Sequence, residues 1–194
     1  MVSEEVLFIG DKSIWSKLAS EFLEENFSNV TIILWERGES YPPNIDSWVG
    51  DRIFSFKSDL VLSKAILENT QKSALNFHPS PPQYRGVGGY KYAIYNNDLV
   101  FGVTCHHMIE KVDVGRIIMV HYFPILNSEK ASSLEKRAGA YSLILLYQIV
   151  QLIISGESLP ESGETWQGKL RTHKQLQEFI DNIKSINPQH NSIM

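Results

Sequence analysis

One stretch, residues 74–89, constrains this chain more than any other, because an apolar segment runs directly into a loop rich in Pro and Gly. Its first five residues, Ala-Leu-Asn-Phe-His, are typical of a strand that ends at His78. Side chains alternate along a strand, so Asn76 and His78 share one face and Phe77 lies on the other. In open α/β sheets, ligands bind beyond the carboxyl ends of the strands. The stretch therefore predicts a chemical site where this strand ends.

Short apolar runs before this stretch alternate with amphipathic segments, which is the pattern of a parallel sheet with right-handed crossovers. Ser13 and Ser58 are candidate helix N-caps. The strands expected are 6–10, 30–35, 52–56 and 74–78, with helices at 14–26 and 59–69. We therefore predict an α/β, Rossmann-like, mostly parallel sheet flanked by helices, with a shortened N-terminal half of three strands. Gly10 is a single glycine, so the dinucleotide fingerprint is missing and NAD is not expected.

The second half of the chain predicts further strands and then helices. Thr172 opens a capping-box pattern, Thr-His-Lys-Gln, and Ser128 is a candidate cap for a long apolar helix. The elements expected are a short helix at 90–95, strands at 99–108 and 117–123, and helices from 128 to about 156 and from 172 to 183. The tail from Asn187 is expected to be loose.

Length and composition favour one soluble domain. The 194 residues suit a single catalytic domain, 1–194, with a core of about 1–160 and a C-terminal helical extension of about 161–194. The net charge of −4 disfavours nucleic acid as a partner. Cys105 is the only cysteine, the acidic N-terminus does not resemble a signal peptide, and the apolar run 141–154 is short for a membrane span. We expect a cytoplasmic protein that does not associate with membranes.

Asn76, His78 and Asp113 are the candidate catalytic residues. An imidazole can accept a proton, a carboxylate can orient it, and an amide can donate to an oxygen that becomes negative. The three together suit acyl transfer to an amine. Spacing alone leaves another interpretation open, in which the Asn and His satisfy loop backbone groups and Asp113 caps a turn. His106 and His107 are adjacent on a strand and face opposite sides, so no two-His metal site, and no metal, is expected.

A family resemblance strengthens the catalytic interpretation. Residues 76–80, Asn-Phe-His-Pro-Ser, are followed by Tyr-Arg-Gly at 84–86. Residues 102–108, Gly-Val-Thr-Cys-His-His-Met, and 110–118 form a second block. These blocks resemble the signature of formyltransferases that use 10-formyltetrahydrofolate, and within that superfamily they are most similar to sugar N-formyltransferases acting on nucleotide-linked amino sugars. The resemblance runs from about 52 to 179.

The resemblance implies roles for individual residues. Asn76 would contact the formyl oxygen, His78 would handle the amine proton, and Asp113 would support His78. Two loops would hold the pterin of 10-formyltetrahydrofolate, formed by Phe56, Lys57, Ser58, Met108, Ile109, Glu110, Lys111 and Val112. Arg116 occupies a position where the family usually has Pro, and the shortened N-terminal half bears on how complete this pocket is.

The catalytic loop also suggests the substrate. Cations can pair with a diphosphate and aromatic rings can stack on a base. The expected substrate contacts are Tyr84, Arg85, Gly86, Gly88, Gly89, Tyr90 and Lys91, with Tyr92 and Arg116 nearby. This favours a dTDP-linked 3- or 4-amino-deoxysugar. The run 141–154 is more apolar than one helix face needs, and we therefore expect a homodimer. The alternatives are glycinamide ribonucleotide, methionyl-tRNA, which the net charge and the lack of a second basic domain disfavour, or a non-catalytic folate- or nucleotide-binding homologue.

Overall fold

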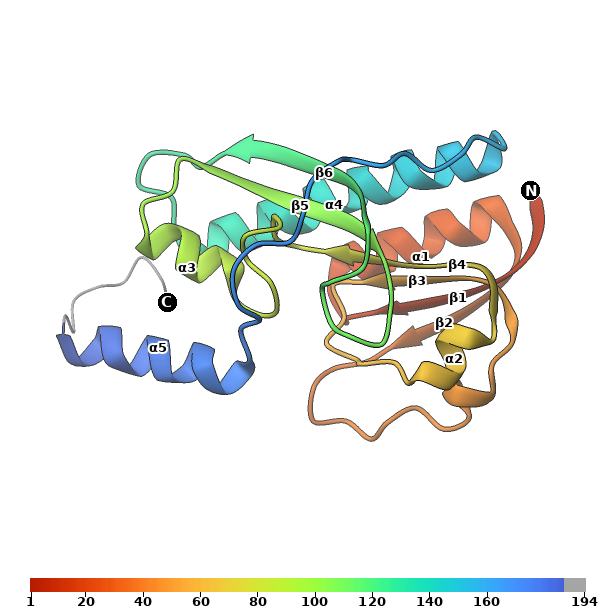
Figure 1. Ribbon diagram of the computed structural model, residues 1–194, viewed down its shortest axis with the longest axis horizontal. Coiled ribbons are helices and arrows are strands. Elements are labelled where there is room, and N and C mark those ends of the chain that lie inside the picture. Colours follow the sequence, from red (N-terminus) through yellow and green to blue (C-terminus); the bar gives the residue numbers. More distant parts are fainter. Residues whose placement is uncertain (187–194) are drawn as a thin grey trace.

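A computed structural model describes residues 1–186 and shows one six-stranded sheet with helices on its faces (Figure 1). The elements are β1 Val2–Gly10, α1 Ile14–Asn26, β2 Phe27–Leu34, a 3-10 turn η1 Ile45–Ser47, β3 Gly50–Phe56, α2 Lys64–Glu68, β4 Thr70–His78, α3 Gly89–Tyr95, β5 Val100–His107, β6 Ile117–Pro124, α4 Ala131–Ile154 and α5 His173–Ile186.

The strand order is β2-β1-β3-β4-β5-β6. The first four strands in this order are parallel, β5 is antiparallel to β4, and β6 is antiparallel to β5. The predicted α/β fold with a mostly parallel sheet is confirmed, and three strands precede β4 as expected. All four parallel strands end at the same edge, and His78 lies at the end of β4.

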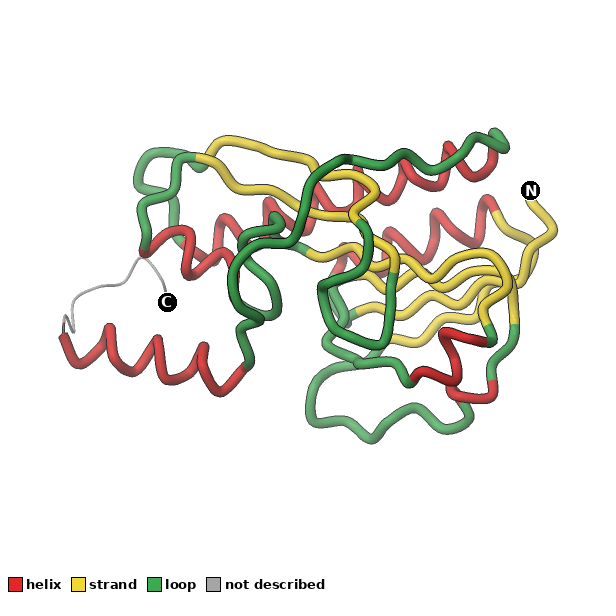
Figure 2. The backbone as a smooth tube through the Cα atoms, viewed as in Figure 1, coloured by secondary structure: helices red, strands yellow, loops and turns green. Residues whose placement is uncertain are grey.

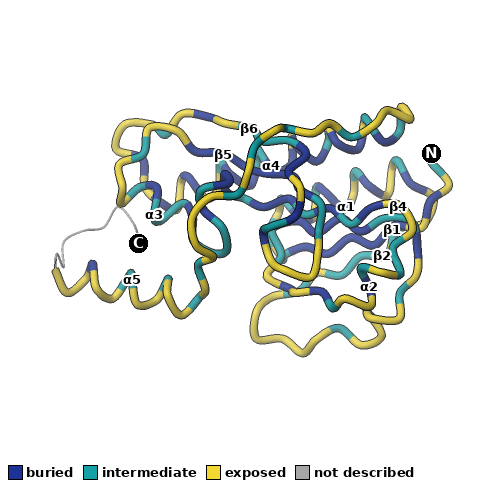
Figure 3. Tube along the Cα trace, viewed as in Figure 1, coloured by how far each residue is buried: buried dark blue, intermediate teal, exposed yellow. Residues whose placement is uncertain are grey.

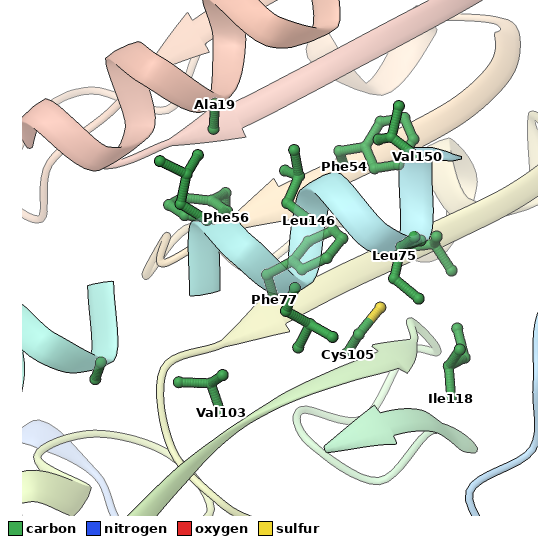
Figure 4. Packing of buried hydrophobic residues seen from close by; sticks show 14 of the residues in the cluster. Ala19, Phe54, Phe56, Leu75, Phe77, Val103, Cys105, Ile118, Leu146 and Val150 are labelled. Carbon is green, nitrogen blue, oxygen red and sulfur yellow. The ribbon is translucent and has the colours of Figure 1, made fainter. Parts of the chain in front are cut away.

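α1 and α4 cover one face of the sheet. Phe54, Phe56 and Phe77 project from adjacent strands toward Leu146 and Val150 of α4 (Figure 4). Their rings lie about 6 Å apart, in tilted or stacked pairs. This continuous apolar layer holds β3, β4 and β5 in a fixed register, so the strand ends that carry the site are rigid. Cys105 is fully buried in the same layer, and burial raises the pKa of its thiol.

The opposite face is covered only in part by α2, and the expected helix 59–69 is wrong in length. Residues 58–63 are extended and α2 begins at Lys64. Leu60 and Leu62 are buried in the second apolar cluster while Val61 between them is exposed, a period of two that suits extended chain. Ser58 does not cap a helix: its hydroxyl accepts a hydrogen bond from Leu60 N at 3.1 Å.

α4 begins at Ala131, so the expected cap at Ser128 is also wrong. Ser128 has a left-handed φ of 62°, and the cap position is taken by Lys130, whose backbone carbonyl accepts from Ser133 N and Leu134 N without any side-chain cap bond. Within the described residues α4 is the one helix long and apolar enough to cross a membrane by length and composition alone. Its buried side packs on α1, β4 and β5, which accounts for that apolarity.

A long connection and an exposed helix follow α4. Figure 2 shows residues 155–172 almost entirely as loop, running back past β5 and β6 to α5. The predicted capping box is confirmed, because Thr172 N donates to Gln175 Oε1 at 2.8 Å and Gln175 N donates to the Thr172 hydroxyl at 3.3 Å. α5 is mostly exposed and stacks Phe179 on Tyr92 of α3 (Figure 3). The prediction for the tail from Asn187 lies outside the described residues.

Candidate active site

Four polar side chains come to one face of the sheet through the pairing of β4 with β5. Asn76 pairs with His106, and His78 pairs with Thr104. The intervening residues, Phe77 and Cys105, point into the apolar core. The shared face of Asn76 and His78 is therefore confirmed. The Thr104 hydroxyl donates to the Ser80 carbonyl at 2.8 Å, which fixes the turn that follows His78.

Asp113 reaches this face from the loop between β5 and β6. Its backbone has a left-handed φ of 48°, unusual for a residue other than Gly and typical of functional positions. Oδ2 accepts a hydrogen bond from Gly86 N at 2.7 Å and lies 3.7 Å from Nδ1 of His78, while Oδ1 lies 3.4 Å from Nε2 of His106. Burial raises the pKa of this carboxyl, but the nearby imidazoles of His78 and His106 and the Gly86 N–H together hold the pKa well below its usual range.

The backbone sets the tautomer of His78. Nε2 lies 2.8 Å from the carbonyl oxygen of Tyr84, which can only accept, so Nε2 carries a proton. In the neutral ring the lone pair is then on Nδ1, the nitrogen nearest Asp113. A proton accepted at Nδ1 forms an imidazolium beside a carboxylate, which stabilises it. The geometry therefore suits a general base at Nδ1.

Sequence reasoning missed two residues of the site, His106 and Trp166. The His106 ring is 3% exposed, and its Nε2 lies 3.0 Å from Nδ2 of Asn76. Trp166, from the connection between α4 and α5, sets its ring edge-on to His106 with centroids 4.8 Å apart, and its Nε1 donates to the Gly115 carbonyl at 2.7 Å. Because side chains alternate along the predicted strand 99–108, His106 lies on the same face as Thr104. Once β5 is known to pair with β4, that alternation places His106 beside Asn76 and could have identified it as a site residue.

The candidate catalytic groups line a cavity of about 350 Å³. One side of it is formed by the ends of β1 and β3 and by the loop after β5, the other by the loop after β4, α3, α4 and α5. Beyond Asn76, His78, His106 and Asp113, the lining residues include Asp11, Trp35, Arg37, Lys57, Ser58, Leu60, Leu62, Leu67, Met108, Ile109, Glu110, Lys111, Val112, Gly86, Gly88, Tyr90, Glu135, Ala138, His173 and Leu176.

Lys57 is the charged residue at the end of β3. It has a left-handed φ of 51°, and its ammonium pairs with Asp11 at 2.8 Å beside the cavity. Asp11 also accepts from the hydroxyls of Ser13 and Ser16, so Ser13 bonds this carboxylate and makes no side-chain cap bond to α1. Burial raises the pKa of Asp11, and these partners, Lys57 first among them, bring it below its usual value.

Several residues expected to bind substrate or donor do not reach the cavity. Phe56 is fully buried in the core. Tyr84 is 4% exposed and its hydroxyl donates to Asp98, so its ring is not open for stacking. Gly89 packs against the side chains of Ser80 and Tyr84, and Lys91 lies over the ring of Tyr90.

Arg85 and Arg116 are likewise engaged elsewhere. The Arg85 guanidinium donates to the carbonyls of Asp113 at 2.8 Å, Val112 at 3.4 Å and Gly168 at 3.4 Å, so it fastens the loop that carries the carboxylate. Arg116 pairs with Glu161 on the surface. The aromatic and cationic side chains that do line the cavity are Trp35, Arg37, Lys57, Tyr90 and Lys111.

Within residues 1–186, no group of three His, Cys, Asp or Glu side chains is arranged to hold a metal ion.

A family model described as formyl transferase matches residues 50–150, more than half of the chain. This range contains Asn76, His78 and Asp113 and the strands that position them. The chain belongs to the formyl transferase family, which confirms the resemblance seen in the two sequence blocks.

Two curated relatives are each 30% identical to this chain. One is the bifunctional polymyxin resistance protein ArnA of Wigglesworthia glossinidia brevipalpis, matched over 60% of this chain and 19% of its own length. The other is methionyl-tRNA formyltransferase of Halalkalibacterium halodurans, matched over 59% of this chain and 39% of its own length. The chain thus spans less than half the length of either relative.

A solved structure shares the fold. It is the N-formyltransferase of Helicobacter canadensis, a complex with folinic acid and dTDP-3-aminofucose. The TM-score is 0.72 at 20% identity, over 88% of this chain and 71% of that one. The similarity confirms a formyltransferase fold for the described sheet and helices.

Proposed function

We propose that this chain transfers a formyl group from 10-formyltetrahydrofolate to an amine. The observation that carries the proposal is the convergence of Asn76, His78 and Asp113 in one cavity at the ends of the parallel strands. Membership in the formyl transferase family supports it.

In this proposal each group has one task. An Asn76 N–H donates to the formyl oxygen as that oxygen gains negative charge. Nδ1 of His78 takes the proton that the attacking amine loses, because Nε2 is occupied by the Tyr84 carbonyl. His78 can return that proton to the folate nitrogen as its bond to the formyl carbon breaks, so that tetrahydrofolate is the leaving group. Asp113, ionised and buried, stabilises the imidazolium formed beside it. Gly86 N and Arg85 hold Asp113 and its loop in place.

The lining of the cavity fits the folate donor. Leu60, Leu62 and Met108 give apolar walls for a flat heterocycle, and the backbone of residues 108–112 offers polar groups at its edge. When bound, the donor supplies the activated formyl group. We propose that Lys57 and Ser58 border the same subsite, since both line the cavity beside Asp113.

We propose a dTDP-linked 3- or 4-amino-deoxysugar as the acceptor. The Helicobacter canadensis protein was solved with dTDP-3-aminofucose, and the cavity here carries aromatic rings at Trp35 and Tyr90 and cations at Arg37 and Lys111. Rings of this kind stack on a base and cations pair with a diphosphate. Burial raises the pKa of Tyr90, and Glu135 raises it further through its negative charge and by accepting a hydrogen bond from the Tyr90 hydroxyl, so Tyr90 stays neutral.

Methionyl-tRNA is a second candidate acceptor, because a methionyl-tRNA formyltransferase is among the curated relatives. The net charge of −4 disfavours a polyanionic substrate. Glycinamide ribonucleotide remains a further amine to include in any assay.

The test compares specificity constants at one fixed concentration of 10-formyltetrahydrofolate. The substrates are a dTDP-linked amino-deoxysugar, the same sugar without its nucleotide, methionyl-tRNA and glycinamide ribonucleotide. We expect the nucleotide-linked sugar to react best, and removal of the nucleotide to lower kcat as well as affinity because remote binding energy positions the amine. Equal constants for the two sugars would overturn the sugar-nucleotide assignment. Binding of a folate analogue without turnover of any amine would indicate a non-catalytic homologue.

We also propose that the chain is a single catalytic domain that forms a cytoplasmic homodimer. Ile144 of α4 is 47% exposed, and a shallow apolar groove beside it is lined by Met119, Tyr147 and Leu152. Light scattering at micromolar concentration should give twice the monomer mass, and a monomer mass would contradict the dimer.

A further inference from the structure

His106 and Asn76 form a cross-strand pair that the roles above leave unused. The two residues are register partners in the antiparallel ladder of β4 and β5, so their side chains lie side by side on the cavity face. Nδ2 of Asn76 lies 3.0 Å from Nε2 of His106. The His106 ring is 3% exposed and Trp166 packs edge-on against it, so the ring has little freedom to turn.

The backbone fixes which nitrogen of His106 carries the proton. Nδ1 lies 2.8 Å from the carbonyl oxygen of His107, which can only accept, so Nδ1 donates. In the neutral ring Nε2 then has a lone pair, and it accepts an N–H of the Asn76 amide. His78 carries its proton on the opposite nitrogen, Nε2, because the Tyr84 carbonyl demands it.

Asp113 competes for the same nitrogen. Oδ1 lies 3.4 Å from Nε2 of His106, and a proton on Nε2 would be donated to that carboxylate. One nitrogen cannot accept from the amide and donate to the carboxylate at once. The Asn76 contact is shorter by 0.4 Å, 3.0 Å against 3.4 Å, so we assign the acceptor role to Nε2.

We propose that His106 is a positioning residue that fixes the orientation of the Asn76 amide, an inference that rests on the proposed formyl transfer. An amide can turn by half a revolution and exchange its oxygen for its nitrogen with little change in shape. Because Nε2 of His106 accepts a hydrogen bond from the Asn76 amide, it holds the NH2 end of that amide in place. One N–H is bonded to His106, and the other is left to meet the formyl oxygen.

Two substitutions of His106 separate positioning from packing. His106→Gln retains a side-chain oxygen at about the reach of Nε2, whereas His106→Leu fills similar space without an acceptor. We expect His106→Leu to lower kcat about ten- to a hundredfold, less than loss of the Asn76 donor itself, with KM for the donor changed by less than about threefold. His106→Gln should recover most of that loss.

A double-mutant cycle tests whether His106 acts through Asn76. In the Asn76→Ala background there is no amide to orient, so His106→Leu should change kcat by less than about twofold. Losses that multiply in the double variant would overturn the proposal, as would a His106→Gln variant no faster than His106→Leu.

A spectroscopic measurement decides the question independently of turnover. Nitrogen-15 NMR of the intact chain should show His106 neutral, protonated on Nδ1, with an Nε2 resonance that shifts in Asn76→Ala. A doubly protonated ring, or an Nε2 resonance unaffected by Asn76→Ala, would overturn the proposal. A wild-type chain with no formyl transfer would overturn the proposed function, while this measurement would still decide the His106–Asn76 assignment.

Discussion

The backbone N–H of Gly86 donates a 2.7 Å hydrogen bond to Oδ2 of Asp113, and both residues have left-handed backbones, with φ of 80° and 48°. Beside this bond, Arg85 donates to the Asp113 carbonyl at 2.8 Å. The loop that follows His78 therefore holds the loop that carries the Asp113 carboxylate. The two loops position each other, and neither can move without disturbing the His78–Asp113 distance.

Gly86→Ala should destabilise this junction. A Cβ on Gly86 would lie 2.1 Å from the carbonyl oxygen of Arg171, and alanine disfavours a φ of 80°. We expect a loss of about 2–3 kcal/mol in the free energy of unfolding, together with a fall in kcat. Chemical denaturation measures the first and a turnover assay the second.

Gly163→Ala is the matched control. Gly163 has a similar φ of 72°, but an added Cβ meets nothing within 4 Å. We expect a cost of about 1 kcal/mol, from backbone strain alone, with kcat unchanged. Equal costs for the two variants would show that the contact with Arg171 does not matter.

The sequence was enough to predict the core of the site because strand alternation depends on local chain geometry. Asn76 and His78 had to share a face once 74–78 formed a strand, and Phe77 had to enter the core. Asp113 was a candidate because a carboxylate can orient an imidazole, and the resemblance supported that role, but no local pattern encodes the distance over which its loop brings it back to His78.

The rest of the site depends on tertiary contacts. His106 joins it through the antiparallel register of β5 on β4, and Trp166 through a connection that crosses the sheet. Arg85 and Tyr84 were predicted to face substrate because they neighbour the catalytic loop in sequence. In the structure the Arg85 guanidinium donates to backbone carbonyls and the Tyr84 hydroxyl donates to Asp98. Proximity in sequence therefore did not predict the direction of these two side chains.

Asp113→Asn should change how stability depends on pH. The pKa of Asp113 is lower in the folded chain than the ordinary value, so the ionised carboxylate stabilises the fold above the unfolded pKa of about 4, and this contribution is lost as pH falls below it. We therefore expect the wild-type advantage over Asp113→Asn in unfolding free energy to be constant above about pH 5 and to shrink toward pH 3.

Urea denaturation at a series of pH values measures this difference. Asp98→Asn provides a comparison carboxylate outside the cavity, one that accepts the Tyr84 hydroxyl. A wild-type advantage in unfolding free energy that grows as pH falls would contradict the lowered pKa of Asp113.

Trp166 should matter for turnover although it lies outside the cavity lining. Its ring is edge-on to both imidazoles, with centroids 4.8 Å from His106 and 5.8 Å from His78, and both imidazoles are buried. Trp166→Ala admits water behind both rings and should lower kcat by about tenfold or more, because water weakens the local electrostatic interactions. Trp166→Phe retains an apolar ring, loses only the bond to Gly115, and should keep more activity.

The neighbouring Gln167→Ala is the control for Trp166, since Gln167 is exposed and is held through its backbone N–H to Pro82. We expect wild-type kcat for that variant. If Trp166→Ala matched Gln167→Ala in turnover, shielding of the imidazoles would have no role.

The three catalytic candidates should differ in how much each contributes. Asn76→Ala removes one donor to the formyl oxygen and should lower kcat by about a hundred- to a thousandfold.

His78→Ala removes the imidazole whose Nδ1 lone pair lies beside Asp113, and we expect turnover below detection. Both side chains lie at the cavity and not in the apolar core, so circular dichroism and thermal melts should show folded variants. His121→Ala on β6 is the matched control, because His121 does not line the cavity and its imidazole is hydrogen-bonded to Gln148. Wild-type turnover in His78→Ala, or a His121→Ala variant as impaired as His78→Ala, would remove Nδ1 of His78 from the mechanism.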